Sequence, residues 1–238
     1  RSHLENLAAK VAARDSMGMY LSEEAVVRQI REVVPALFER EGVLRRDKIL
    51  AEALNRNLGR TILDRLKAAV GEIPELQNLG GGKNNEWYST KENIERELYA
   101  VETADSQKGL FPPISEEFEP FKDMTDHDYS AQAEVVRGIL GNTDRYVLFR
   151  GVAGSGKTST LRELCAGLKS GGLFGIHLIA PTNSAVDVLK EEGFESSQTV
   201  ASFLMGDDKP PRGSYLIVDE SGLNSLKDGV AIMRLATE

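Results

Sequence analysis

The fold of this chain is decided by the stretch GVAGSGKT at residues 151–158, which fits the pattern G-x-x-x-x-G-K-S/T at every fixed position. Glycines at these spacings let the backbone curl so that successive N–H groups point inward at an anion. A helix that begins at the lysine adds the positive end of its dipole. We therefore predict a phosphate site made of Gly151, Gly154, Ser155, Gly156, Lys157, Thr158 and Ser159.

The sequence around this loop alternates between strand and helix patterns. Strands that alternate with helices are typical of βαβ units and a parallel sheet flanked by helices. A phosphate loop between a strand and a helix is the context that the pattern needs, whereas the alternative is a glycine-rich turn with an exposed lysine. The predicted strands are 146–150, 176–180 and 215–219, and the predicted helices are 130–140, 157–168 and 183–192.

Two carboxylates follow the last apolar run of this region, YLIV, as Asp219 and Glu220. Taken alone, they could be a solvated strand end. With the phosphate loop, they predict hydrolysis of a nucleoside triphosphate: Lys157 reaches the β- and γ-phosphates, and the Thr158 hydroxyl and Asp219 hold Mg²⁺. Glu220 would orient the attacking water or take its proton. We assign the catalytic roles to Lys157 and Glu220.

The N-terminal part of the chain, residues 1–101, has a helical pattern interrupted by a turn-rich stretch. Helices are predicted at 26–38, 46–57 and 60–70. Apolar residues on both sides of GGGKNN then predict two short strands joined by a flexible tip. Three helices and a hairpin suggest a winged helix, and the alternative is a small helical domain that only packs against its neighbour.

A capping box formed by Ser89 and Glu92 predicts the start of a further helix that runs through Val101. Residues 102–128 contain three prolines and many carboxylates, so we predict an acidic linker there. The expected division is a helical or winged-helix domain at 1–101, this linker, and the nucleotide-binding domain at 129–238.

The composition excludes some classes of protein. The 238 residues are 41% hydrophobic and 28% charged, and no apolar run is long enough to cross a bilayer. A net charge of −8 argues against a generally basic, duplex-wrapping surface but permits a local groove for a single strand. Cys165 is the only cysteine, which excludes an internal disulfide and favours a reducing, cytoplasmic location.

Four stretches near the two motifs carry a resemblance to a known family. They are SAQ at 130–132 with Val135, APTNSA at 180–185, QTVASFL at 198–204 and DESG at 219–222. They resemble motifs of superfamily 1 DNA helicases of the RecD-like group, most of all the helicase part of MobF-type conjugative relaxases. Gly222 departs from the family's Asp-Glu-Ala/Ser-Ser pattern, and WYSTKE at 87–92 is a looser match upstream.

The resemblance implies an α/β fold with a partial RecA-like P-loop sheet, ATP and Mg²⁺ as cofactors, and single-stranded DNA as a partner. It implies that Gln132 reads the adenine, which favours ATP over GTP. Helix capping is the alternative role for Thr182, Thr199 and Ser202. The DNA contacts that the resemblance implies are Pro181, Thr182, Asn183, Thr199 and Ser202.

The resemblance also implies partners and missing parts. The first residues lack an initiator methionine, and the chain ends soon after Glu220, so we expect a piece of a longer protein that binds ATP and hydrolyses it very slowly by itself. The expected partners are the remaining helicase domains and conjugation or secretion machinery. The alternatives are a RecD-like repair helicase and a non-catalytic DNA-binding or docking module. The scattered His3, His127 and His177 predict no nicking chemistry.

Overall fold

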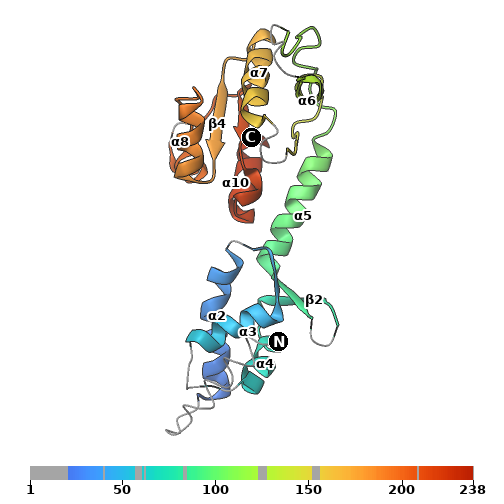
Figure 1. Cartoon of the computed structure of the whole chain (residues 1–238). Coiled ribbons are helices and arrows are strands. Elements are labelled where there is room, and N and C mark those ends of the chain that lie inside the picture. The colour runs from blue at the N-terminus through green and yellow to red at the C-terminus, as the bar shows by residue number, and fades with distance from the viewer. Residues whose placement is uncertain are drawn as a thin grey trace. The chain divides into compact units, whose positions relative to one another are not determined.

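The computed structural model describes residues 21–39, 41–56, 61, 63–82, 85–122, 128–151, 156–207 and 209–237. The chain divides into two units, one made of residues 1–99 and 225–230 and the other of residues 100–224 and 231–238. Each unit has its own hydrophobic core. Figure 1 shows the helices and strands of both units. Within the described ranges, none of the helices has the length and apolar character needed to cross a bilayer.

The first unit packs three helices against an antiparallel sheet of order β1-β3-β2. The three predicted helices and the predicted hairpin are confirmed within the described residues. Strand β1 was not predicted, because its three residues are too short to show an alternating pattern. The elements are α2 (Glu23–Phe38), β1 (Val43–Arg45), α3 (Arg46–Arg56), α4 (Leu63–Gly71), β2 (Leu76–Gly80) and β3 (Trp87–Thr90).

Helix α2 begins where the sequence offers a cap and packs along one apolar stripe. The Ser22 side chain accepts a hydrogen bond from the Ala25 N–H, which satisfies one donor of the first turn. Val26, Ile30 and Val34 follow at spacings of four and are all buried in the first core. These residues lie on one face of a helix, so their burial fixes which side of α2 faces the sheet and the other helices.

The capping box predicted at Ser89 is wrong. Ser89 is the third residue of β3, is buried, and donates its hydroxyl proton to the Gly42 carbonyl at 2.6 Å. Thr90 caps α5 (Lys91–Ser106) instead, because its Oγ1 accepts the Asn93 N–H at 3.1 Å. The pairing of β3 with β1 determines which hydroxyl caps the helix, because it places Ser89 opposite Val43 within the sheet and leaves Thr90 at the start of α5.

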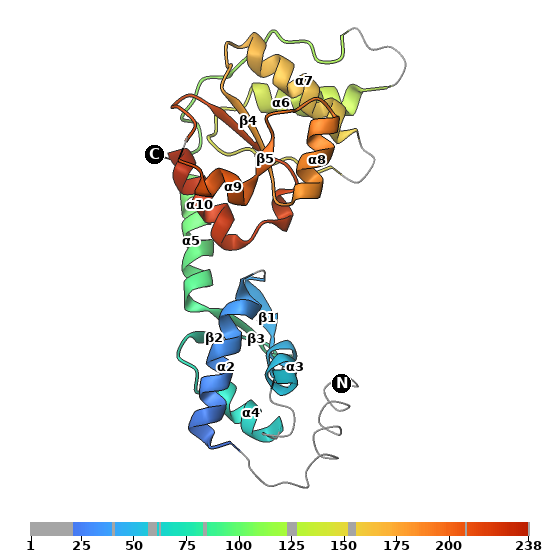
Figure 2. The same cartoon turned by 90° about the vertical axis from the view of Figure 1, so that its left-hand side faces the viewer.

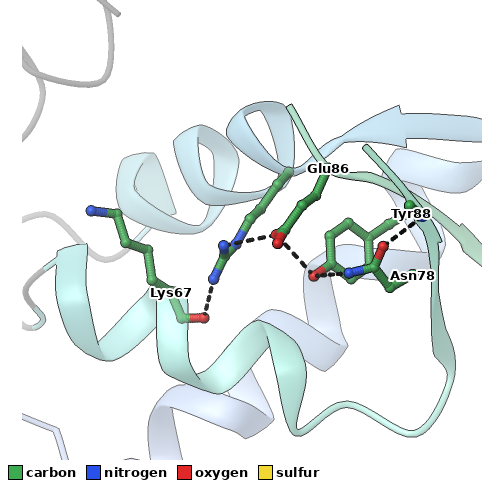
Figure 3. A network of polar contacts seen from close by, with 6 residues as sticks. Lys67, Asn78, Glu86 and Tyr88 are labelled. Carbon is green, nitrogen blue, oxygen red and sulfur yellow. Dashed lines mark hydrogen bonds and ion pairs between the residues drawn. The ribbon is translucent and has the colours of Figure 1, made fainter. Parts of the chain in front are cut away.

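A polar network ties the hairpin to the helices of the first unit (Figure 3). The Arg46 guanidinium donates to Glu86 Oε2 at 2.8 Å and to the Lys67 carbonyl at 2.7 Å. Tyr88 donates to the same carboxylate at 3.3 Å and accepts from Asn78 at 3.3 Å. Burial, and next the Glu86 charge, raise the pKa of Tyr88, so it stays a donor at neutral pH.

The second unit is a three-stranded parallel sheet with helices on both faces, as the alternating pattern predicts. The sheet order is β5-β4-β6. Its elements are α6 (Ser130–Leu140), α7 (Lys157–Ser170), β4 (Ile176–Ala180), α8 (Asn183–Glu191), β5 (Gln198–Thr199), α9 (Val200–Met205), β6 (Tyr215–Val218), η1 (Ser221–Leu223) and α10 (Leu226–Thr237).

Alternate residues of the central strand β4 face two different layers. Leu178 packs with α6, α7 and α8, whereas its neighbour Ile179 packs with Val200 and Phe203 of α9 and with Ile232 of α10. Figure 2 shows β4 and β5 between these two groups of helices. Both faces are therefore covered, which explains the largely apolar sequences of β4 and β6.

The strand predicted at residues 146–150 is wrong: this segment belongs to neither sheet. Strands β4 and β6 pair with each other, and Leu148 remains 91% exposed. The segment is instead fixed to α10, because Tyr146 donates to the Met233 carbonyl at 2.8 Å and Arg145 donates to the Ala236 carbonyl. A sequence rich in aromatic and aliphatic residues favours extended backbone, but a strand also needs a neighbour to pair with.

The predicted acidic linker at 102–128 has apolar anchors on the second unit. Its first residues are the end of α5, and Ile114, Phe118 and Phe121 pack in or against the second core. The Ile114 N–H donates to the Leu140 carbonyl at 2.7 Å. Carboxylates dominate the composition of this segment and lie between these apolar positions. Composition alone therefore does not reveal that the apolar residues pack on the second core.

We expect Gly167→Ala to destabilise the second unit by about 1–3 kcal/mol, because the added methyl would overpack a full core. A Cβ at Gly167 would overlap a Leu140 methyl group and lie 3.0 Å from Phe118 Cδ1. Gly138→Ala in α6 is the matched control: no atom lies within 4 Å of its Cβ, so a gain of up to about 1 kcal/mol is expected from helix propensity.

Amide hydrogen exchange of α7 during urea unfolding measures this difference. The only tryptophan, Trp87, lies in the first unit and would not report on it. Equal stability of the two alanine variants would contradict the close packing of α6 on α7.

Candidate functional site

The phosphate loop leads into α7 through a left-handed glycine. Gly156 has φ 73° and is the N-cap of α7, a conformation that glycine adopts without strain. Helix α7 begins at Lys157, as the sequence predicts, and Lys157, Thr158 and Ser159 form its half-buried first turn. Gly151 is half-buried, and the predicted contacts Gly154 and Ser155 lie outside the described residues.

A glycine N-cap suits this end of the helix to an anion. The first intrahelical bond of α7 runs from the Thr160 N–H to the Gly156 carbonyl at 3.0 Å. In any α-helix the N–H groups of the first turn have no acceptor within the helix, and a glycine N-cap has no side chain that could cap them. A phosphate oxygen can accept these hydrogen bonds and is further attracted by the helix dipole.

Gln132 comes from α6 and lies beside this loop. A Cβ built on Gly156 would be 3.2 Å from Gln132 Nε2, so the Gln132 amide lies against the residue at which α7 begins. The fold thus brings together two residues that are distant in sequence and that the sequence analysis placed in one site. The recognition of a base by Gln132 stays a prediction.

The acid pair lies just past the end of β6. The Asp219 N–H donates to the Ile179 carbonyl at 2.9 Å, which extends the pairing of β6 with β4 by one bond. Asp219 Oδ1 accepts the Glu220 N–H at 2.9 Å. Asp219 is half-buried with one oxygen held by the backbone, whereas Glu220 is exposed. The two carboxylates therefore have different surroundings, and their two roles stay predictions.

The oxygens of Thr158 and Asp219 are the kind that Mg²⁺ takes as ligands. This ion needs only one or two protein oxygens and completes its shell with phosphate and water. The internal bond to Asp219 Oδ1 leaves the second carboxylate oxygen, Oδ2, for such a ligand role. The donor set fits the predicted ion.

The predicted DNA contacts lie at the same edge of the sheet as the acid pair. Ala180 pairs with Thr199, and Ile179 pairs with Val218, so the carboxyl ends of all three parallel strands meet there. Thr182, Asn183 and Ser202 are exposed at this edge, and Pro181 and Thr199 are half-buried.

Capping is confirmed as a role of two of these residues. Thr182 Oγ1 accepts the Ala185 N–H at 3.2 Å, and Thr199 Oγ1 accepts the Ser202 N–H at 3.1 Å. Ser202 contributes only its backbone N–H to this arrangement. A threonine hydroxyl that accepts such a bond still has its own proton, so capping and donation to a ligand are compatible.

Sequence reasoning missed a group of residues that connects α6 with α7, namely Phe121, Tyr129 and Glu163. The Phe121 N–H donates to Glu163 Oε2 at 2.9 Å, and the Phe121 and Tyr129 rings stack with centroids 4.6 Å apart. A contact between residues 42 positions apart leaves no local signal in the sequence. Phe121 also lies in the segment that composition marks as a linker.

We expect Glu220→Gly to stabilise the second unit by about 1 kcal/mol, because a residue with a side chain is strained in left-handed backbone. Glu220 has φ 48°. Glu220→Gln keeps the strain and should leave the unfolding free energy unchanged, while both variants lose the carboxylate. Chemical denaturation, followed by amide hydrogen exchange of α7, measures the unfolding free energy of the two variants. A glycine variant that is less stable than the glutamine variant would contradict this account of the backbone.

Comparison with known proteins agrees with this geometry. A family model described as AAA domain matches residues 129–238. No curated protein matches the chain. The matched segment begins at the first residue before α6 and includes the phosphate loop, the acid pair and every strand of the parallel sheet. Residues 129–238 are thus similar to AAA-type P-loop NTPase domains, and their α/β arrangement with a small parallel sheet fits a RecA-like fold.

Proposed function

We propose that residues 129–238 are the nucleotide-binding motor domain of a DNA helicase, which couples ATP hydrolysis to movement on single-stranded DNA in the complete protein. The supporting observation is the common edge of the parallel sheet. The acid pair after β6 and the exposed polar residues after β4 and β5 lie at that edge together.

The nucleotide site works through this chain's own groups. The first turn of α7 binds the β- and γ-phosphates, and the Lys157 ammonium neutralises charge that grows on them in the transition state. Thr158 and Asp219 would hold Mg²⁺, which would neutralise negative charge on the phosphates. The exposed Glu220 orients the attacking water. Gln132, beside Gly156, selects adenine.

One backbone hydrogen bond links this chemistry to the DNA. The Asp219 N–H bonds to the Ile179 carbonyl, and Thr182 follows Ile179 by three residues. A change in the position of Asp219 on hydrolysis therefore moves the end of β4 and the start of α8. Neutral hydroxyl and backbone donors there contact phosphates weakly enough to release and rebind them as the strand moves.

The first unit fits a winged-helix-like accessory domain in this proposal. Its element order runs α2, β1, α3, α4, β2, β3, with the last two strands forming the hairpin. We propose that the parent protein is a conjugative relaxase, in line with the motif resemblance at residues 198–204.

A RecD-like repair helicase is the alternative within the same class. A docking module without catalysis would not need the complete set Lys157, Thr158, Asp219 and Glu220, whose presence favours an enzyme.

A titration with fluorescent single-stranded DNA, with and without ATP and Mg²⁺, tests the proposal. We expect a nucleotide-dependent change in DNA affinity that Lys157→Ala abolishes, because ATP binding should fall by about tenfold or more when this charge-assisted contact is lost. DNA affinity that does not change with nucleotide would favour the docking module instead. The absence of DNA binding under all conditions would contradict the helicase proposal and leave a P-loop ATPase.

Substitutions of Thr199 separate DNA contact from capping. Thr199→Ala removes both the cap and the hydroxyl donor, whereas Thr199→Asp keeps an N-cap acceptor but places a negative charge toward a phosphate. We expect both variants to lose DNA affinity, the aspartate variant more strongly. Full recovery of DNA affinity in Thr199→Asp would assign Thr199 to capping alone.

A further inference from the structure

Phe121 has an unfavourable backbone conformation that neighbouring groups must maintain. Its φ is 60°, and the only other described residue with a side chain in this region is Glu220. A buried aromatic residue in left-handed backbone costs about 1–2 kcal/mol and persists only where its surroundings fix it. Two contacts do so: the Phe121 N–H bonds to Glu163 Oε2 at 2.9 Å, and its ring stacks on Tyr129 with an interplanar angle of 1°.

These two contacts connect the helices that form the nucleotide site. Glu163 lies on α7, which begins at Lys157 of the phosphate loop. Tyr129 is the N-cap residue of α6, and its carbonyl accepts the first helical bond from Ala133 at 2.8 Å. Helix α6 carries Gln132, whose side-chain amide lies against Gly156 at the start of α7. Phe121 therefore joins the P-loop helix to the turn that presents Gln132.

This connection adds support at the start of α6, where the helix's own cap is weak. The Tyr129 side chain accepts no hydrogen bond from the helix, and its φ and ψ, −96° and 13°, are outside the extended region usual for an N-cap. Asp128 Oδ1 accepts the Ser130 N–H at 3.0 Å, which satisfies one donor but does not link α6 to α7. The ring stack and the Glu163 bond add such a link at the start of α6, beside the core packing of α6 on α7.

We propose that Phe121, Tyr129 and Glu163 form an aromatic clamp of positioning residues that holds Gln132 against the P-loop and thereby sets the preference for adenine over guanine. The inference rests on the proposed function, in which Gln132 recognises the base. A side-chain amide distinguishes two bases only when its donor and acceptor are held in place. The phosphates are bound by the first turn of α7, so their binding does not depend on the clamp.

The test measures dissociation constants for fluorescent ADP and GDP and for pyrophosphate, all with Mg²⁺, on the whole chain. We expect Tyr129→Ala to lose an ADP over GDP preference of about tenfold, the value of one well-placed hydrogen bond, with pyrophosphate affinity unchanged. Tyr129→Phe keeps the stacked ring and is the matched control, with the preference retained. A purely structural role would weaken ADP, GDP and pyrophosphate together.

Phe121→Gly is a second variant, and it tests the clamp even if Tyr129→Ala does not fold. Glycine accepts the left-handed φ and keeps the N–H donor, so the backbone conformation survives while the ring is lost. We expect the same loss of base preference. Thermal unfolding of both variants reports whether the second unit remains folded.

A double variant decides whether the clamp acts through Gln132. Gln132→Ala should remove the preference for ADP over GDP. Adding Tyr129→Ala to this variant should then cause no further change in that preference. A wild-type chain without adenine preference would contradict both the role of Gln132 and the clamp. A wild-type preference that persists in Tyr129→Ala and Phe121→Gly would contradict the clamp alone and leave the proposed function intact.

Discussion

The parallel pairing of β4 with β6 is the constraint on which the site depends. Four residue pairs, from Ile176 with Tyr215 to Ile179 with Val218, bring two segments together that are separated by a whole βα unit. The bond from the Asp219 N–H to the Ile179 carbonyl then extends the pairing to the edge that holds the acid pair. Parallel strands end at the same edge, so the acid pair and the polar residues after β4 must be neighbours.

Close packing of α6 on α7 supplies the other half of the site. Gly167 lets the two helices approach, since any side chain there would meet Leu140 and Phe118. The same approach brings Gln132 to Gly156, where α7 begins. The core and the nucleotide site therefore share their geometry, and a change in helix spacing would alter both.

Backbone strain is concentrated around this site. The described residues with side chains in left-handed backbone are Phe121, which is bonded to Glu163 of α7, and Glu220, which belongs to the acid pair. Each is fixed by hydrogen bonds or ring contacts of neighbouring groups. Strained residues survive where the surrounding fold over-determines them, and such places are often those where a side chain must keep one position.

The sequence by itself determined the local features of this protein. The start of α7 at Lys157, the acid pair after β6 and the caps at Thr182 and Thr199 each depend on residues within one turn or one strand, and a local pattern is enough to predict them. The tertiary structure decided what depends on distant partners. Residues 146–150 lie outside the sheet, and Thr90 rather than Ser89 caps α5. Phe121 is hydrogen-bonded to Glu163, which is distant in the sequence. Pairing and packing choose among locally equivalent residues, because they depend on contacts that no local pattern records.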